Sequence, residues 1–160
     1  MLTPREQGDI GELSALSWLT PQGATVSIPF GHSPDYDLVA DLDVGLLRVQ
    51  VKTATFFRHG RWEVSLATYG GNQSWSGLVK RLDTSRCDYL FVLVRDGCRW
   101  FIPSTALGGG RRILLGGPKY AAFEVETGRP IPSPAVDETP STIDSPDPRG
   151  DVRVAKGTRL

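Results

Sequence analysis

The sequence has few of the residues that build compact metal and redox centres. It contains two cysteines, Cys87 and Cys98, and two histidines, His32 and His59, with no close pair among them, which argues against a zinc site. Each cysteine lies in or beside an apolar segment, where a free thiol usually acts as a small buried hydrophobe. We therefore expect a reducing compartment, although two cysteines leave a disulfide open.

Long hydrophobic runs are also absent. No apolar stretch approaches the roughly 20 residues that a membrane span needs, and the N-terminus lacks the basic-then-apolar order of a signal peptide. We therefore expect a soluble, cytoplasmic protein. With 160 residues, 39% of them hydrophobic, the chain is large enough for one core of ordinary size, so we predict a single domain over residues 1–126.

The composition changes after residue 126. Six of the twelve prolines fall in residues 127–160, where aromatic and large apolar residues are almost lacking. Such a segment buries too little apolar surface to offset the entropy of ordering it. We predict that 127–160 is a disordered, Pro-rich tail.

Charge is divided along the chain although the net charge is zero. Residues 1–51 contain two Lys or Arg against seven Asp or Glu, a net charge of −5, whereas residues 52–126 contain eleven against six, a net charge of +5. An acidic region beside a basic one suits a metal-dependent enzyme that acts on a polyanion. Scattered solubilising charge explains the same counts.

The N-terminus carries the start signals of a helix. Thr3 and Glu6 form a capping-box pattern, and Pro4 suits the first helical position. Residues 20–23 are expected to end the helix. Its apolar stripe is predicted to consist of Ile10, Leu13, Leu16 and Leu19 or Trp18.

Strand patterns alternate with turn residues over most of the remaining chain. A hairpin over 88–103 is predicted to turn at Asp96-Gly97, a pair that favours the primed turns of hairpins. We predict strands at 24–30, 37–42, 46–52 and 61–67, a short helix from Leu78 to near Arg86, and one or two short strands within 108–126.

The strand at 46–52 has one polar face. Side chains alternate along a strand, so Arg48, Gln50 and Lys52 share a face while Leu47, Val49 and Val51 point the other way. If a two-residue turn at Asp43-Val44 connects it to the preceding strand, Asp37 lies directly opposite Gln50. A bulge at Gly45 would shift this register by one residue.

An Asp, a Gln and a Lys on one face suit phosphodiester chemistry. The carboxylate of Asp37 and the amide oxygen of Gln50 can ligate Mg²⁺, with Mn²⁺ as a substitute, because both are hard oxygen donors. Lys52 can orient a water or stabilise charge on a phosphate under attack. An exposed polar face of an antiparallel hairpin is the simpler alternative.

Asp37, followed thirteen and fifteen residues later by Gln50 and Lys52, resembles the motif of the PD-(D/E)XK nuclease superfamily. Pro34-Asp35 spells the literal "PD", but strand placement favours Asp37 as the matching acid. The helix also resembles the Gly-x-x-Gly-Glu helix that precedes the motif in many members, resolvase-like enzymes included, and this implies that Glu12 joins the metal site.

The resemblance implies an α/β fold with an αβββαβ core and a central mixed sheet. Gln50 stands where Asp or Glu is usual, as in the branch that contains group I intron homing endonucleases. The implied activity is Mg²⁺-dependent cleavage of DNA, with RNA not separated from DNA at this stage. Two copies would be needed to cut two strands, which favours a homodimer or higher homo-oligomer. The alternative is an inactive nucleic-acid-binding or interaction module with the same fold.

Basic side chains beyond the motif are candidates for phosphate contacts. We predict DNA-binding roles for Arg58, His59, Arg61, Lys80 and Arg81. The runs GGGRR at 108–112 and GGPK at 116–119 can present backbone N–H groups to a phosphate, but neither has P-loop spacing. We expect both runs to be turns that flank a short strand.

Overall fold

The computed structural model describes residues 1–31, 35–69 and 79–133, which form one long helix and several short strands. Helix α1 spans Pro4–Leu19, and 3₁₀ turns cover η1 Thr20–Gln22, η2 Ser104–Ala106 and η3 Pro118–Phe123. The strands are β1 Thr25–Ser27, β2 Leu38–Leu42, β3 Gly45–Ala54, β4 Phe57–Arg58, β5 Arg61–Ser65, β6 Ala67–Tyr69, β7 Val79–Arg81, β8 Tyr89–Val94, β9 Arg99–Pro103, β10 Arg112–Leu115 and β11 Glu124–Val125.

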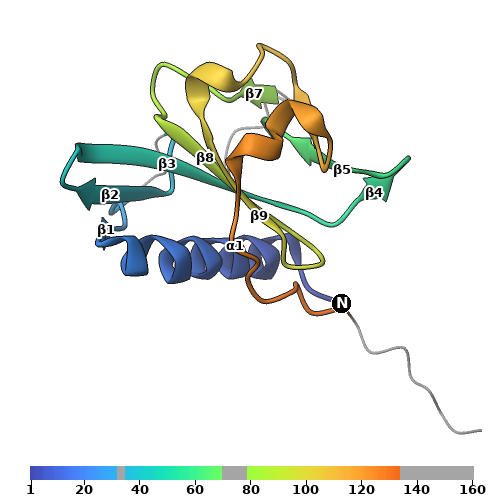
Figure 1. Cartoon of the computed structure of the whole chain (residues 1–160), viewed down its shortest axis with the longest axis horizontal. Helices are drawn as coiled ribbons and strands as arrows, with labels where there is room; N and C mark the ends of the chain where they lie inside the picture. The colour runs from blue at the N-terminus through green and yellow to red at the C-terminus, as the bar shows by residue number, and fades with distance from the viewer. Residues whose placement is uncertain (32–34, 70–78, 134–160) are drawn as a thin grey trace, which may run out of the picture.

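A six-stranded mixed sheet in the order β1-β2-β3-β8-β9-β11 forms the central layer. Helix α1 covers one face of this sheet, and a smaller sheet in the order β10-β5-β4 lies toward the other face (Figure 1). Within the described residues, β3 and β8 are the parallel pair of the central sheet, and its other neighbours are antiparallel. The predicted helix-plus-mixed-sheet architecture is confirmed.

Helix α1 begins as the sequence predicts. The Thr3 side chain accepts a hydrogen bond from the Glu6 N–H, and the Glu6 carboxylate accepts one from the Thr3 N–H. The predicted apolar stripe is wrong in part, because Leu13 is 64% exposed and the fully buried positions are Gly11, Ala15 and Leu19. Small residues at a spacing of four let the helix lie close to the sheet.

The β2–β3 hairpin has the predicted register. Leu42 pairs with Gly45 and Leu38 pairs with Val49, so the turn at Asp43-Val44 contains two residues and no bulge shifts the pairing. Val49 and Val51 belong to the core cluster beneath α1. Because side chains alternate along β3, Gln50 and Lys52 point to the other side of the sheet.

The β8–β9 hairpin forms as predicted but with a longer connection. The Val94 N–H donates to the Cys98 carbonyl, which leaves Arg95, Asp96 and Gly97 between the paired residues. Gly97 has a φ of +93°, whereas Asp96 has no positive φ, so the predicted primed turn is wrong. A three-residue connection with a left-handed glycine replaces it.

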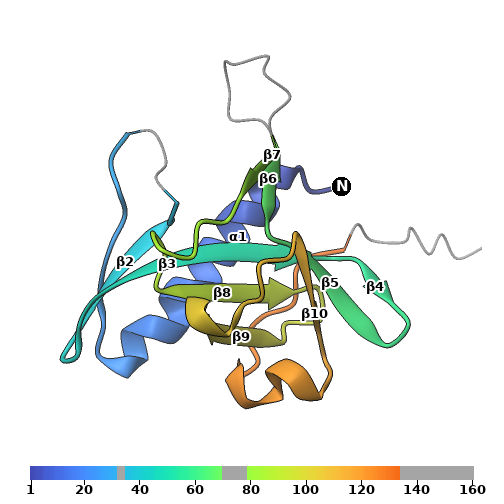
Figure 2. The ribbon, with the colours of Figure 1, turned by 90° about the horizontal axis from the view of Figure 1, so that it is seen from above.

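The predicted short helix from Leu78 to near Arg86 is also wrong. Leu78 lies outside the described residues, and Val79–Arg81 form β7, which pairs with β6. The apolar spacing of Val79 and Leu82 fits a helical turn, but strand pairing satisfies the backbone here, and tertiary context overrides so short a pattern. The connection from β3 to the parallel β8 therefore runs through strands β4 to β7 (Figure 2).

Seven residues of the predicted disordered tail are ordered. The Gly128 N–H donates to the Gly97 carbonyl, the Ile131 N–H donates to the Arg95 carbonyl, and Ile131 is buried in the core beneath α1. Residues 127–133 are therefore part of the fold, and residues 134–160 lie outside the described residues. The sequence placed these seven residues in the tail because isolated apolar residues such as Ile131 have no periodicity.

The two cysteines are free thiols, with Cys87 buried and Cys98 half-buried. Among the described segments there is no helix with the length and apolar character needed to span a bilayer.

Candidate catalytic site

Asp37 lies one residue before β2 and is bonded to β3. Its N–H donates to the Val49 carbonyl at 2.9 Å. Its carboxylate Oδ2 accepts the Val51 N–H at 2.8 Å and a hydrogen bond from the Gln50 side-chain Nε2. The pairing of β2 with β3 ends at Leu38, so beyond it the Val51 N–H of β3 has no partner on β2. The Asp37 carboxylate accepts this N–H instead. The expected juxtaposition of Asp37 and Gln50 is confirmed.

Gly11 allows α1 to approach β3 at this point. A Cβ on Gly11 would lie 2.6 Å from Thr53 Cγ2 and 3.1 Å from Val51 Cγ1, so only glycine fits without movement. The next residue, Glu12, is half-buried and lies close enough to Asp37 for the two carboxylates to repel each other. Gly11 therefore allows the helix to place the Glu12 carboxylate near Asp37.

Burial and charge shift the pKa values of Glu12, Asp37 and Lys52. Desolvation is the main cause that raises the pKa of Asp37, and hydrogen bonds from Val51 and Gln50, together with the charge of Lys52, oppose it. Desolvation also raises the pKa of Glu12, with repulsion from Asp37 and Asp9 adding to it. Desolvation lowers the pKa of Lys52 against the attraction of Asp37. The three groups thus form one electrostatic cluster.

The donor set of this cluster fits a hard divalent cation. Two carboxylates that destabilise each other's charged form are stabilised by a cation between them, and oxygen is the ligand that Mg²⁺ prefers. No group of three His, Cys, Asp or Glu side chains comes together in the described ranges, so a third oxygen donor from this cluster would be the amide of Gln50 rather than an acid. In the structure Gln50 presents its nitrogen, rather than its amide oxygen, to Asp37.

Residues 2–107 match the family described as PD-(D/E)XK endonuclease. The chain belongs to this family. A solved structure, that of the bacterial homing endonuclease I-Ssp6803I, has the same fold with a TM-score of 0.59 and 22% identity, and the match covers 78% of this chain and 88% of that chain. No curated protein matches the sequence.

Asp35, the acid of the literal "PD", has different bonding partners from Asp37. Its carboxylate is buried and forms ion pairs with Lys80 at 2.5 Å and Arg86 at 3.1 Å. These pairs tie the segment before Asp37 to β7 and to the turn that follows β7. Sequence reasoning missed this role because Asp35 is far along the chain from both Lys80 and Arg86 and no local pattern joins them.

On the polar face of β3, Arg48 has a different role from Gln50 and Lys52. Arg48 forms a bidentate pair with Asp88, through Nε at 3.1 Å and Nη2 at 3.0 Å, and its N–H donates to the same carboxylate at 2.7 Å. Arg48 is therefore a structural residue that joins β3 to the start of β8. Gln50 and Lys52, farther along β3, are the residues of this face that fit the family motif.

The predicted phosphate-binding residues fall into two groups. Arg58, His59 and Arg61 belong to the β4–β5 hairpin, whose turn has His59 at a φ of +51°. Lys80 and Arg81 lie on strand β7, not on the predicted helix. The charge of Lys80 is paired with Asp35, so its availability to a phosphate is reduced.

Proposed function

We propose that the protein is a metal-dependent endonuclease that hydrolyses phosphodiester bonds of DNA. The observation that carries this proposal is the cluster formed by Glu12 of α1, Asp37 just before β2, and Gln50 and Lys52 of β3. Membership of the PD-(D/E)XK endonuclease family and the fold shared with a homing endonuclease support it.

Glu12, Asp37 and Gln50 would hold Mg²⁺, or Mn²⁺ in its place. When bound, the cation polarises a phosphate and lowers the pKa of nearby water. Lys52 brings a positive charge beside Asp37 in a half-buried site, where it can orient the attacking water and stabilise the charge that develops on phosphorus oxygens. The water oxygen bonds to phosphorus and loses a proton, one P–O ester bond breaks, and the leaving oxygen takes up a proton.

Several properties of the proposed enzyme follow from this chemistry. One centre cuts one strand, so cleavage of a duplex needs two centres, and we propose a homodimer or higher homo-oligomer. The two free thiols suit the cytoplasm, where we place the protein. The choice of DNA over RNA is part of the proposal.

The proposal is tested by cleavage of supercoiled plasmid and branched DNA in Mg²⁺, Mn²⁺ or EDTA. The native protein should nick DNA only with a divalent cation, and Asp37→Ala and Lys52→Ala should each lose at least a hundredfold in rate. Lys52→Ala should still bind metal, measured by calorimetry, whereas Asp37→Ala should not. Metal-independent DNA binding without cleavage, unchanged in Lys52→Ala, would instead identify an inactive binding module.

A further inference from the structure

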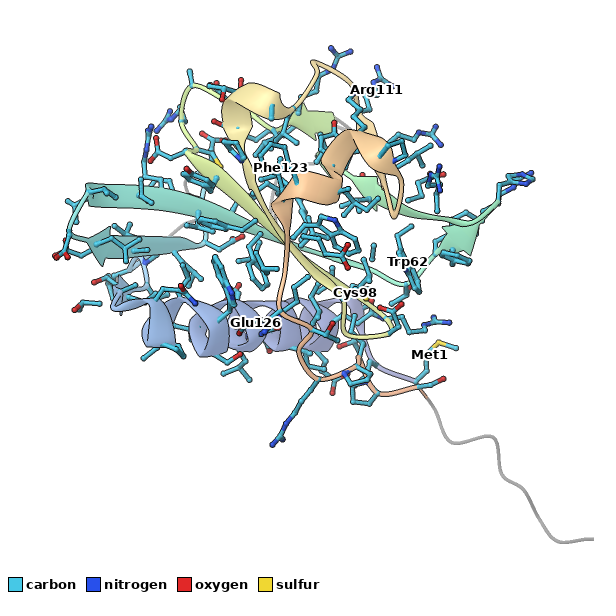
Figure 3. The ribbon with its side chains drawn as sticks, viewed as in Figure 1. Met1, Trp62, Cys98, Arg111, Phe123 and Glu126 are labelled. Atoms are coloured by element: carbon cyan, nitrogen blue, oxygen red, sulfur yellow. The ribbon has the colours of Figure 1, made fainter. Side chains whose placement is uncertain are left out.

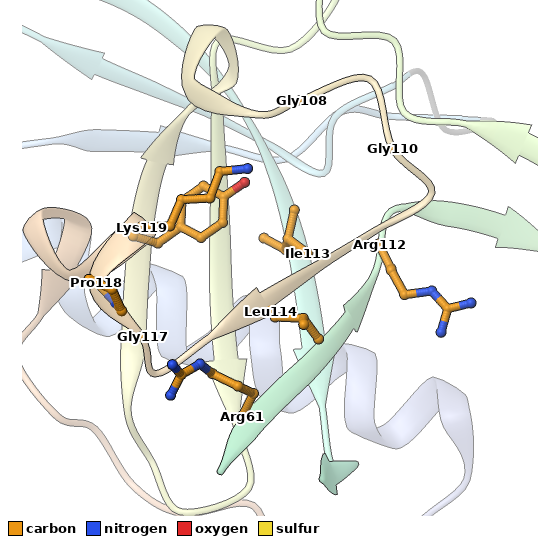
Figure 4. Close-up of a pocket in the computed structure, with 10 residues that line it drawn as sticks. Arg61, Gly108, Gly110, Arg112, Ile113, Leu114, Gly117, Pro118 and Lys119 are labelled. Carbon is orange, nitrogen blue, oxygen red and sulfur yellow. The ribbon is translucent and has the colours of Figure 1, made fainter. Parts of the chain in front are cut away.

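A second group of basic side chains lines a pocket on the β10-β5-β4 layer. The pocket has a volume of about 400 Å³ and lies between β5, β10 and η3 (Figure 4). Arg61, Arg112 and Lys119 line it together with glycines of both Gly-rich runs, among them Gly110 and Gly117. The glycine runs are turns that flank β10, as predicted, but they also bring basic residues to one cavity.

Arg61 is held in place by backbone groups rather than by an acid. Its Nη1 donates to the carbonyls of Gly116 at 3.1 Å and Gly60 at 3.3 Å, and it pairs with no carboxylate among the described residues. A Cβ on Gly117 would lie 2.6 Å from the Cζ and Nε of Arg61, so the guanidinium lies directly against this glycine. The remaining N–H groups of a guanidinium fixed in this way suit two oxygens of one phosphate.

The β4–β5 hairpin places two arginines opposite each other. Arg58 pairs with Arg61 across the strands, and like charges in this position destabilise a hairpin. Arg58 donates to His59, and no acid of the described segments neutralises either arginine. A polyanion that binds along this edge would remove the repulsion.

Arg112 and Lys119 differ in availability. Arg112 pairs with Glu63 at 2.8 Å, and its guanidinium points away from the pocket (Figure 4). The ammonium of Lys119 lies 5.1 Å from the centre of the Tyr120 ring and has no acidic partner in the described part of the chain. Arg111, next to Arg112, is exposed on the outer side of the same layer, away from α1 (Figure 3). Arg61 and Lys119 are thus the pocket's available cations.

The pocket and the side chains of Gln50 and Lys52 are on the same side of the central sheet, whereas Glu12 reaches the cluster from α1 on the other face. Ala54, two residues after Lys52 on β3, packs in the core cluster that contains Val64 of β5 and Ile113 of β10. Because residues two apart on a strand share a face, Lys52 points to the side on which β5 and β10 lie. One duplex is therefore able to contact both sites without passing around the sheet.

We propose that this pocket binds a backbone phosphate of duplex DNA and positions the duplex on the enzyme. The proposal rests on the proposed function and adds a second contact site, built by Arg61, Lys119 and Gly117. Tyr120 is buried, so the pocket offers charge and backbone but no exposed ring for a base. The contact should hold the duplex in register without reading its sequence.

The test is equilibrium binding of a fluorescent duplex in EDTA, over a series of salt concentrations, with the full chain. An Arg61→Ala/Lys119→Ala double variant should bind roughly tenfold more weakly, and the slope of log affinity against log salt should fall by roughly 2. Arg5→Ala is the control for net charge, because Arg5 is on α1, across the sheet. It should leave both quantities near native.

Gly117→Ala tests the built site without changing any charge. Its Cβ should displace the Arg61 guanidinium and weaken binding several-fold, while Gly109→Ala, which would meet nothing within 4 Å, should have no effect. Thermal unfolding should show that all variants are folded. Native affinity and slope in the double variant, or an equal loss in Arg5→Ala, would overturn the proposal.

Failure of this proposal is distinguishable from failure of the proposed function. Normal metal-dependent cleavage with unchanged binding in the pocket variants would reject the pocket and keep the nuclease. Binding that depends on Arg61 and Lys119, with no cleavage under any metal, would keep the pocket and reject the nuclease. Absence of duplex DNA binding by the native protein, or stronger binding of the matching RNA duplex, would overturn the pocket as a DNA contact.

Discussion

The side-chain Nε2 of Gln50 donates a hydrogen bond to Oδ2 of Asp37, which joins β3 to the start of β2. The name of the family gives Asp or Glu at the position of Gln50, and an ionised carboxylate cannot donate this bond. The amide therefore stabilises the carboxylate of Asp37 in the absence of metal, as its opposing effect on the Asp37 pKa shows. An amide at this position also gives the proposed set of metal ligands one negative charge fewer than an acid would.

The Gln50→Glu variant should be less stable than the native protein without metal and should bind Mg²⁺ more tightly. In EDTA the free energy of unfolding should fall by about 1–2 kcal/mol, because a donor is lost and a like charge is placed beside Asp37. Mg²⁺ should bind more tightly than to the native protein, because a charged ligand replaces a neutral one. Urea unfolding in EDTA and calorimetric titration with Mg²⁺ measure the two effects.

Gln50→Met is the matched control, since it removes the hydrogen bond without adding charge. It should lose stability in EDTA and gain no metal affinity. A Gln50→Glu protein as stable as the native one in EDTA would contradict the role given to the amide.

Gly11→Ala and Gly8→Ala should have opposite effects on stability, although both lie in α1. A Cβ at Gly8 meets nothing within 4 Å, so alanine should stabilise the helix by about 0.5–1 kcal/mol. A Cβ at Gly11 would lie 2.6 Å from Thr53 Cγ2, and the β-branched Thr53 side chain cannot easily rotate away. Alanine at this position should therefore lower the free energy of unfolding by about 1–3 kcal/mol. Urea unfolding compares them, and recovery in Gly11→Ala/Thr53→Ser identifies the clash. Equal effects at the two glycines would refute it.

Removing the cations around Asp35 should cost more than removing Asp35 itself. The side chains of Lys80 and Arg86 are 62% and 61% exposed, so they return to water readily, whereas that of Asp35 is 6% exposed. Lys80→Ala/Arg86→Ala leaves a buried carboxylate without these two ion-pair partners, which costs about 3 kcal/mol or more. Asp35→Asn should cost less, and adding it to the double variant should restore stability. Unfolding by urea gives all three values, and a fully additive triple variant would disprove the coupling.

Asp88 should make the fold sensitive to acid. Hydrogen bonds from Arg48 lower the pKa of its carboxyl below the ordinary 3.8. A lowered folded-state pKa means that the stabilisation is complete above the unfolded pKa and is lost as pH falls through the folded value. Native protein should therefore melt above Asp88→Asn at pH 7, and the difference should shrink below about pH 4. A difference in melting temperature that does not change with pH would show that charge is not its source.

Local patterns predicted much of this fold because local physics determines it. The capping box of Thr3 and Glu6, the two-residue turn at Asp43-Val44 and the alternation along β3 depend on residues close in sequence. Together they predicted that Asp37 faces Gln50. The predicted helix near Leu82 is wrong because three apolar positions do not determine a helix where a strand partner is available.

The sequence by itself determined the start of α1, the register of β2 on β3 and the face that carries Gln50 and Lys52, since each depends on spacing along one strand or one helix turn. Only the tertiary structure decided how close α1 comes to β3 and which partners Asp35 has. Gly11 lets α1 approach β3 and brings Glu12 to Asp37, while Lys80 and Arg86 occupy Asp35. The packing of α1 on the sheet also buried Ile131, which has no local pattern of its own. Contacts between residues distant in sequence depend on packing in three dimensions, and no period along the chain encodes them.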